Sequence, residues 1–159
     1  FFRSNHPRYP YHLLREEMQE FILDKLQLLI ERKLIKGIGE NGTEYTVIAQ
    51  ILDLPKEILR LIQKFDFTKK NPKLIYINTG ETMISLQDSI LVTFLNLAGF
   101  DILFFVPTGY QSVENYFAEK LMEEHQIGEY KYDMQVPDLN NISTNSTRPS
   151  WRRKLFRRG

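Results

Sequence analysis

Two short segments of the chain pair a hydroxyl side chain with a glycine, a combination well suited to hold an anion or a sugar. Thr79-Gly80 and Thr108-Gly109 each follow a short apolar run. The hydroxyl donates a hydrogen bond, and glycine lets backbone N–H groups come close to a phosphate. These segments therefore predict a binding site for a phosphate or a sugar. The alternative is that both glycines only permit tight turns between a strand and a helix.

Acidic and aromatic residues beside the two segments extend the predicted site. The carboxylates of Glu81 and Glu114 could hold a ribose hydroxyl, a metal ion or a proton in transfer. The ring of Tyr110 could stack on a base or a sugar, while Glu114 could equally serve its own helix dipole. Neither a catalytic residue nor a cofactor follows from these side chains. The full predicted ligand site consists of Thr79, Gly80, Glu81, Thr108, Gly109, Tyr110 and Glu114.

The sequence argues against several well-known kinds of site. Neither Thr-Gly segment continues into Gly-Lys-Ser or Gly-Lys-Thr, so a P-loop nucleotide hydrolase is excluded. Residues 37–42 fit the G-x-G-x-x-G pattern, but they follow a predicted helix instead of a strand, which argues against a dinucleotide site. His12 and Glu16 are spaced like two metal ligands, yet no third ligand can be assigned. We therefore predict no metal site.

Cysteine is absent from the chain, which excludes disulfides, thiolate nucleophiles and cysteine-bound zinc. This absence fits a reducing compartment, and we predict a cytoplasmic protein. The longest apolar run, residues 102–106, is far shorter than the about 20 residues that a membrane helix needs.

The apolar pattern predicts a helical segment first, and strands alternating with helices after it. Helices are predicted over residues 11–32, 46–52 and 55–65, because apolar side chains recur there at intervals of three and four. Ser85 and Asp88 resemble a capping box at the start of a further helix. The remaining predicted elements are strands at residues 73–78, 101–106 and 130–136 and helices at residues 85–98 and 112–125.

The ends of the predicted strands recur at nearly constant intervals. Thr79 and Thr108 are 29 residues apart, and Val106 and Val136 are 30 apart, which matches the length of a βαβ unit. We therefore predict an α/β fold, a Rossmann-like doubly wound parallel sheet present as a βαβαβ half and preceded by an α-helical segment. Ligands of such sheets bind outside the carboxyl ends of the strands, where both Thr-Gly segments would lie. The predicted domains are residues 1–70, a helical segment packing on the core, residues 71–139, the Rossmann-like core, and residues 140–159, a polar linker and basic tail.

Charge divides the chain into an acidic body and a basic tail. Residues 1–147 carry 15 basic and 20 acidic side chains, a net charge of −5, whereas residues 148–159 carry six basic side chains and no acid. The acidic body argues against nucleic-acid binding, and we interpret the helical pair in residues 47–62 as packing helices instead of a DNA-reading motif. The tail could make weak contact with an anionic membrane surface, with RNA or with an acidic groove on a partner, but its few apolar residues favour a solvated tail or one docked on the acidic body.

Several motifs together resemble those of one bacterial family. They are Phe65-Asp-Phe67-Thr-Lys-Lys-Asn-Pro-Lys73, Gly99-Phe-Asp-Ile102, Val106-Pro-Thr-Gly-Tyr110 with Glu114, and Leu155-Phe-Arg-Arg-Gly159. Over most of residues 1–139 the chain is similar to the carboxyl-terminal region of the YceG-like family, found in tellurium-resistance and stress operons. The resemblance implies a bacterial cytoplasmic stress protein whose amino-terminal part precedes this chain. It supplies no catalytic residue, because the family is described only as a component of a biosynthetic module.

Two functional hypotheses follow. The first is a ligand-binding domain that takes a nucleotide or a sugar phosphate at the carboxyl ends of the strands. The second is a noncatalytic interaction module that uses the helical pair or the basic tail to bind a membrane or proteins of the same stress operon. The sequence identifies neither a reaction nor an oligomeric state.

Overall fold

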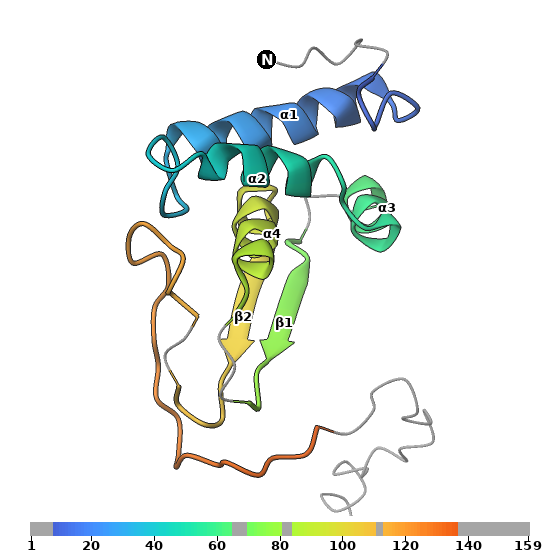
Figure 1. The fold of residues 1–159 in the computed structure, drawn as a ribbon. Coiled ribbons are helices and arrows are strands. Elements are labelled where there is room, and N and C mark those ends of the chain that lie inside the picture. The colour runs from blue at the N-terminus through green and yellow to red at the C-terminus, as the bar shows by residue number, and fades with distance from the viewer. Residues whose placement is uncertain (1–7, 65–69, 81–83, 111–112, 137–159) are drawn as a thin grey trace, which may run out of the picture.

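The computed structural model describes residues 8–64, 70–80, 84–110 and 113–136, and its ribbon is drawn in Figure 1. Three helices come first along the chain, and a strand, a helix and a second strand follow. These elements are α1 (Glu16–Glu31), α2 (Thr43–Ile51), α3 (Lys56–Lys64), β1 (Lys73–Ile77), α4 (Leu86–Leu97) and β2 (Asp101–Phe105).

Helix α1 buries one apolar stripe against the rest of the protein. Ile22, Leu26 and Leu29 lie on this stripe and are almost fully buried, as their helical spacing predicts. The helix begins five residues later than predicted, because the segment before it is held in turns. The side-chain amide of Gln19 donates hydrogen bonds to the carbonyls of His12 and Leu14, at 3.2 and 2.7 Å.

The hydroxyl of Tyr11 holds the connection between α2 and α3. It donates to the carbonyl of Ile51 at 2.7 Å and accepts from the N–H of Leu54 at 2.7 Å. The Ile51 carbonyl is one of the last four in α2, which lack a partner within the helix. Tyr11 itself is buried, with its ring edge-on to Tyr9, and burial raises the pKa of Tyr11 to about 12.

The second half of the fold is a parallel βαβ unit, which confirms the predicted strands at residues 73–78 and 101–106 and the helix between them. β1 and β2 pair in parallel from Lys73 opposite Asp101 to Ile77 opposite Phe105. Helix α4 returns the chain from the end of β1 to the start of β2 and lies along the sheet (Figure 1). Gly99 follows α4 with a φ of 98°, a conformation that glycine adopts without strain.

One hydrophobic core joins the helical segment to the βαβ unit. Ile22 from α1, Val47 from α2 and Phe94 from α4 belong to the same buried cluster. Figure 1 shows α1 and α2 across the end of the sheet where the strands begin, so the carboxyl edge of the strands is at the opposite end. None of the described helices is long and apolar enough to cross a membrane.

The predicted doubly wound sheet is wrong. The described residues form a sheet of two strands, β1 and β2. Residues 113–136 form neither the predicted helix at 112–125 nor the predicted strand at 130–136. Alternate side chains of the latter segment, Tyr130 and Tyr132, are 53% and 60% exposed, so the apolar alternation does not mark a buried strand face.

Pairing with the helical segment explains why the predicted helix does not form. Phe117 forms an antiparallel bridge with Ile35, and the Ala118 N–H donates to the Leu34 carbonyl at 2.9 Å. The carbonyl of Tyr116 accepts from the Lys36 N–H, also at 2.9 Å. The backbone of residues 116–118 therefore forms its hydrogen bonds with residues 34–36 instead of within a helix. These tertiary contacts override the helical periodicity of the sequence.

Candidate functional site

The two Thr-Gly segments leave the sheet at the same edge. Ile77 and Phe105 are partners in the last register pair of the parallel strands, and the N–H of Asn78 donates to the Phe105 carbonyl at 2.9 Å. Thr79 and Thr108 follow these strand ends by two and three residues. The carboxyl edge therefore brings both predicted hydroxyl-glycine turns to one end of the sheet, opposite the helical layer (Figure 1).

The turn after β1 is shaped by an asparagine. The side-chain oxygen of Asn78 accepts a hydrogen bond from the N–H of Gly80 at 3.2 Å, as in an Asx turn. Thr79 and Gly80 are both half-buried at this turn. Glu81, the next predicted site residue, lies outside the described residues.

The turn after β2 contains a buried polar group that lacks a partner. Thr108 is 5% exposed, and its Oγ1 has no hydrogen-bond partner in the described part of the chain. The next residue, Gly109, has a φ of 71° and donates its N–H to the Val106 carbonyl at 3.1 Å. A buried hydroxyl without a hydrogen bond lowers the free energy of unfolding by about 1–3 kcal/mol. A purely structural role for Thr108 would therefore destabilise the fold.

Tyr130 lies against this turn, a position that the sequence does not predict. A β-carbon built on Gly109 would overlap the Tyr130 ring. The adjacent Lys131 N–H donates to the Pro107 carbonyl at 2.9 Å, which fixes the segment across the carboxyl edge. The alternating apolar pattern assigned Tyr130 to a strand, and no local signal in the sequence places its ring beside a glycine 21 residues earlier.

Helix α4 begins at the same edge with a well-formed cap. The Oγ of Ser85 accepts from the Asp88 N–H at 3.0 Å and donates to the Asp88 carboxylate at 2.7 Å. This confirms the predicted cap, although the carboxylate bonds the hydroxyl instead of the Ser85 N–H of a full capping box. The field of Asp88 also reaches Tyr76, whose pKa is raised by burial and, to a lesser extent, by that carboxylate.

The remaining predicted site residues differ in their positions. Tyr110 follows Gly109 directly and is 40% exposed, so it stays with the carboxyl edge. Glu114 lies on the segment that pairs with the helical part of the fold, and its carbonyl accepts the N–H of Phe117 at 3.2 Å. The contacts of this segment thus run toward the helical layer instead of the two turns.

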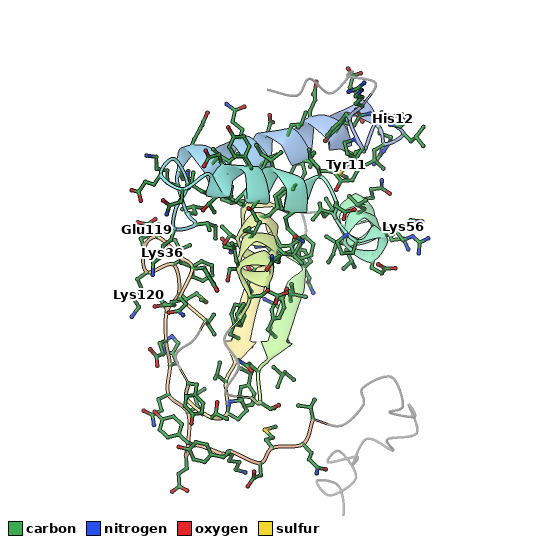
Figure 2. The ribbon with its side chains drawn as sticks, in the orientation of Figure 1. Tyr11, His12, Lys36, Lys56, Glu119 and Lys120 are labelled. Atoms are coloured by element: carbon green, nitrogen blue, oxygen red, sulfur yellow. The ribbon has the colours of Figure 1, made fainter. Side chains whose placement is uncertain are left out.

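The labelled side chains of Figure 2 lie on the helical side of the molecule. Lys36, Glu119 and Lys120 are near one another, where the segment after β2 meets the chain that follows α1, and the Lys36 Nζ donates to the Asn115 carbonyl at 2.8 Å. His12 lies near Tyr11, and its Nδ1 donates to the Tyr9 carbonyl at 2.9 Å. His12 therefore serves the turn before α1.

The chemistry offered by the carboxyl edge is that of binding. Its groups are two hydroxyls, turn backbone, aromatic rings and the positive end of α4, all of which suit an anion or a sugar. Within the described residues, no group of three or more His, Asp or Glu side chains is arranged to hold a metal ion.

Comparison with known proteins places the chain in a family. The profile of the YceG domain matches residues 4–147. An uncharacterized protein YceG of Bacillus subtilis (strain 168) is 31% identical over 93 residues, which cover 57% of this chain and 17% of that protein's length. No solved structure matches the chain. Because the profile covers most of the sequence, the chain belongs to the YceG domain family.

Proposed function

We propose that this YceG domain binds a phosphorylated small molecule, a nucleotide or a sugar phosphate, at the carboxyl edge of β1 and β2. The observation that carries the proposal is the buried Oγ1 of Thr108, which has no hydrogen-bond partner among the described residues. A phosphate oxygen would accept its hydrogen bond and remove the cost of leaving it unsatisfied. Thr79, on the neighbouring turn, would supply a second hydroxyl beside Gly80, whose N–H already donates to the Asn78 side chain.

The start of α4 supports an anionic ligand. The helix has 12 residues, and the N-terminus of a helix carries about half a positive charge. The carboxylate of Asp88 lies in the first turn of α4 and offsets part of this positive charge, so the attraction of the site for an anion is weakened. A phosphate held by two turns and the end of α4 would therefore bind with modest affinity.

Two tyrosine rings support a ligand that contains a base or a sugar. Tyr130 covers Gly109 and is 53% exposed, and Tyr110 is 40% exposed beside it. Stacking on an aromatic ring contributes about 1–3 kcal/mol per base. Inorganic phosphate should accordingly bind more weakly than a nucleotide or a sugar phosphate.

Thermal unfolding with a panel of ligands tests the proposal. The panel contains inorganic phosphate, nucleoside phosphates and sugar phosphates. A ligand at 100 times its dissociation constant adds about 2.7 kcal/mol to the free energy of unfolding. The variant Thr79→Ala/Thr108→Ala should lose this response, whereas Thr46→Ala on α2 should keep it. A panel without any stabilising ligand, or equal responses of the two variants, would contradict the proposal.

The interaction module of the second hypothesis is favoured by the exposed face of α3. Lys56, Arg60 and Lys64 are exposed at intervals of four residues, and Leu61 beside them is 41% exposed. Such a face suits an acidic partner protein. The partners proposed for it are proteins of the same operon in the bacterial cytoplasm. Calorimetric titration of purified operon proteins with the Lys56→Glu/Arg60→Glu variant would show whether α3 is the contact.

A further inference from the structure

One face of the parallel sheet is apolar and exposed, with no described residue covering it. Ile75 and Leu103 are partners in the register and are 59% and 57% exposed, and the next pair, Ile77 and Phe105, is 40% and 47% exposed. We call these four residues the open face. The alternate residues point to the other side of the sheet, where Leu74, Ile102 and Phe104 pack against the hydrophobic core.

An uncovered face is unusual for parallel strands. Parallel sheets are normally buried on both sides, since the connections between strands place helices there. At the amino end of the open face, Lys73 and Asp101 form an exposed ion pair at 2.7 Å. The open face thus lies between this ion pair at one end and the carboxyl edge of the strands at the other. A surface of this extent suits the docking of a short segment.

The open face is too small for a stable dimer through two copies. A large apolar side chain offers roughly 150–250 Å², so four half-exposed ones provide about 400 Å² on each copy. A stable interface needs about 800 Å² per partner. A segment tethered to the same chain is favoured instead, because tethering gives an effective concentration in the millimolar range.

Residues 148–159 have the composition that this surface requires. Trp151, Leu155 and Phe156 are spaced at i, i+4 and i+5, a spacing that would bring them to one side of a helix. These residues carry six basic side chains and no acid, whereas residues 1–147 carry a net charge of −5. Apolar contact and charge complementarity thus favour the same docking.

The chain is also long enough to reach. Lys131 is held at the carboxyl edge by its hydrogen bond to the Pro107 carbonyl, and Trp151 follows 20 residues later. A fully extended segment of this length spans about 66 Å, whereas the five residues of β2 span about 17 Å. The 20 residues from Lys131 to Trp151 are therefore more than long enough to reach the open face.

We propose that residues 148–159 cover the open face, with Trp151, Leu155 and Phe156 packed on Ile75, Ile77, Leu103 and Phe105 and the basic side chains turned outward. The docked tail would supply the second layer that the sheet lacks within the described part of the chain. It also removes exposed apolar surface next to the outer edges of β1 and β2, which pair only with each other among the described residues and would otherwise favour aggregation.

Trp151, the only tryptophan, reports on this docking in the 159-residue chain. We expect short-wavelength emission and weak quenching by acrylamide at all protein concentrations. The Ile75→Lys/Leu103→Lys variant should shift the emission to longer wavelength and raise the quenching constant several-fold. The control Leu13→Lys changes an 87% exposed leucine outside the open face and should behave as the wild type. Circular dichroism verifies that both variants remain folded.

A cysteine pair gives a second readout, because the chain has no cysteine of its own. Leu103→Cys with Leu155→Cys should form an intramolecular disulfide on mild oxidation, whereas Leu13→Cys with Leu155→Cys should not. Trp151 that is fully exposed in the wild type would overturn the proposal. The proposal would also be overturned if Trp151 were shielded only at concentrations at which sedimentation shows a dimer. Shielding of Trp151 only in the presence of vesicles that contain anionic lipid would overturn it as well.

Discussion

The ring of Tyr130 lies directly against Gly109, so close that a β-carbon on this glycine would come within 2.5 Å of Tyr130 Cδ1. The contact joins the irregular segment after β2 to the turn that ends β2. It gives Gly109 a packing role in addition to its φ of 71°. The carboxyl edge is therefore built from two turns and an aromatic residue that the chain brings back from a distance.

Replacing Gly109 with alanine should destabilise the domain for two separable reasons. The left-handed backbone costs a residue with a β-carbon about 1–2 kcal/mol, and the methyl group must also displace Tyr130. In urea unfolding, Gly109→Ala/Tyr130→Ala should be less destabilised than the sum of the two single variants. Strict additivity of the two substitutions would show that the ring and the glycine are independent.

Thr108→Val should stabilise the ligand-free protein while abolishing its ligand response. Valine keeps the shape of the side chain and removes the hydroxyl, which has no partner among the described residues. The free energy of unfolding should therefore rise by about 1 kcal/mol. Urea unfolding measures the gain, and the ligand panel measures the loss. A clear destabilisation by Thr108→Val would indicate that the hydroxyl has a structural partner, and the argument for a ligand would fail.

Asp88→Asn should tighten binding of an anion at the carboxyl edge. The substitution removes a negative charge from the first turn of α4 and keeps an oxygen that can accept from Ser85. Charge at a helix terminus is worth about 0.3–1 kcal/mol, which corresponds to about a two- to fivefold lower dissociation constant. Isothermal titration at low salt measures it, with Asp24→Asn on α1 as the control. Unchanged affinity would place the anion away from α4.

Tyr11→Phe should weaken the junction of α2 and α3. The substitution leaves the Leu54 N–H and the Ile51 carbonyl without the partner that both now share. The expected loss in the free energy of unfolding is about 1–3 kcal/mol. Tyr45→Phe, which removes a hydroxyl from a 73% exposed ring, should change stability by less than about 0.5 kcal/mol. Equal effects of the two substitutions would remove the assigned role of Tyr11.

Stability should fall at alkaline pH because the buried tyrosines resist ionisation. Burial raises the pKa of Tyr11 from 10.0 to about 12 and raises the pKa of Tyr9 further. The unfolded chain therefore loses these protons first, and the stabilisation present below pH 10 is lost as the pH rises from about 10 to about 12. Unfolding midpoints across this range measure the effect. In Tyr11→Phe the slope should be smaller, and an unchanged slope would exclude this tyrosine as a cause.

The sequence predicts the parts of the fold that depend on local pattern. β1, β2, α4 and the Ser85 cap follow from apolar runs, strand-helix spacing and capping chemistry. Helix α2 begins at Thr43, three residues before its predicted start and directly after Gly42, which adopts a φ of 74° at the N-cap.

The missing parts of the prediction depend on contacts between distant residues. The bridge of Phe117 with Ile35 redirects the segment that was predicted as a helix, and no periodicity within residues 112–125 contains that partner. The same limit applies to the candidate site. The spacing of Thr79 and Thr108 predicts that both turns lie at the same edge of the sheet. The position of Tyr130 depends instead on the path of the chain after β2, which no local pattern predicts.

Amide NMR of the assigned domain during titration with a nucleoside phosphate tests ligand binding at the carboxyl edge most directly. We predict saturable shifts of the Gly80 and Gly109 N–H signals, with little change at Arg60 on α3, and loss of these shifts in Thr79→Ala/Thr108→Ala. Shifts confined to α3, or no saturable shift at either glycine across the ligand panel, would contradict the account.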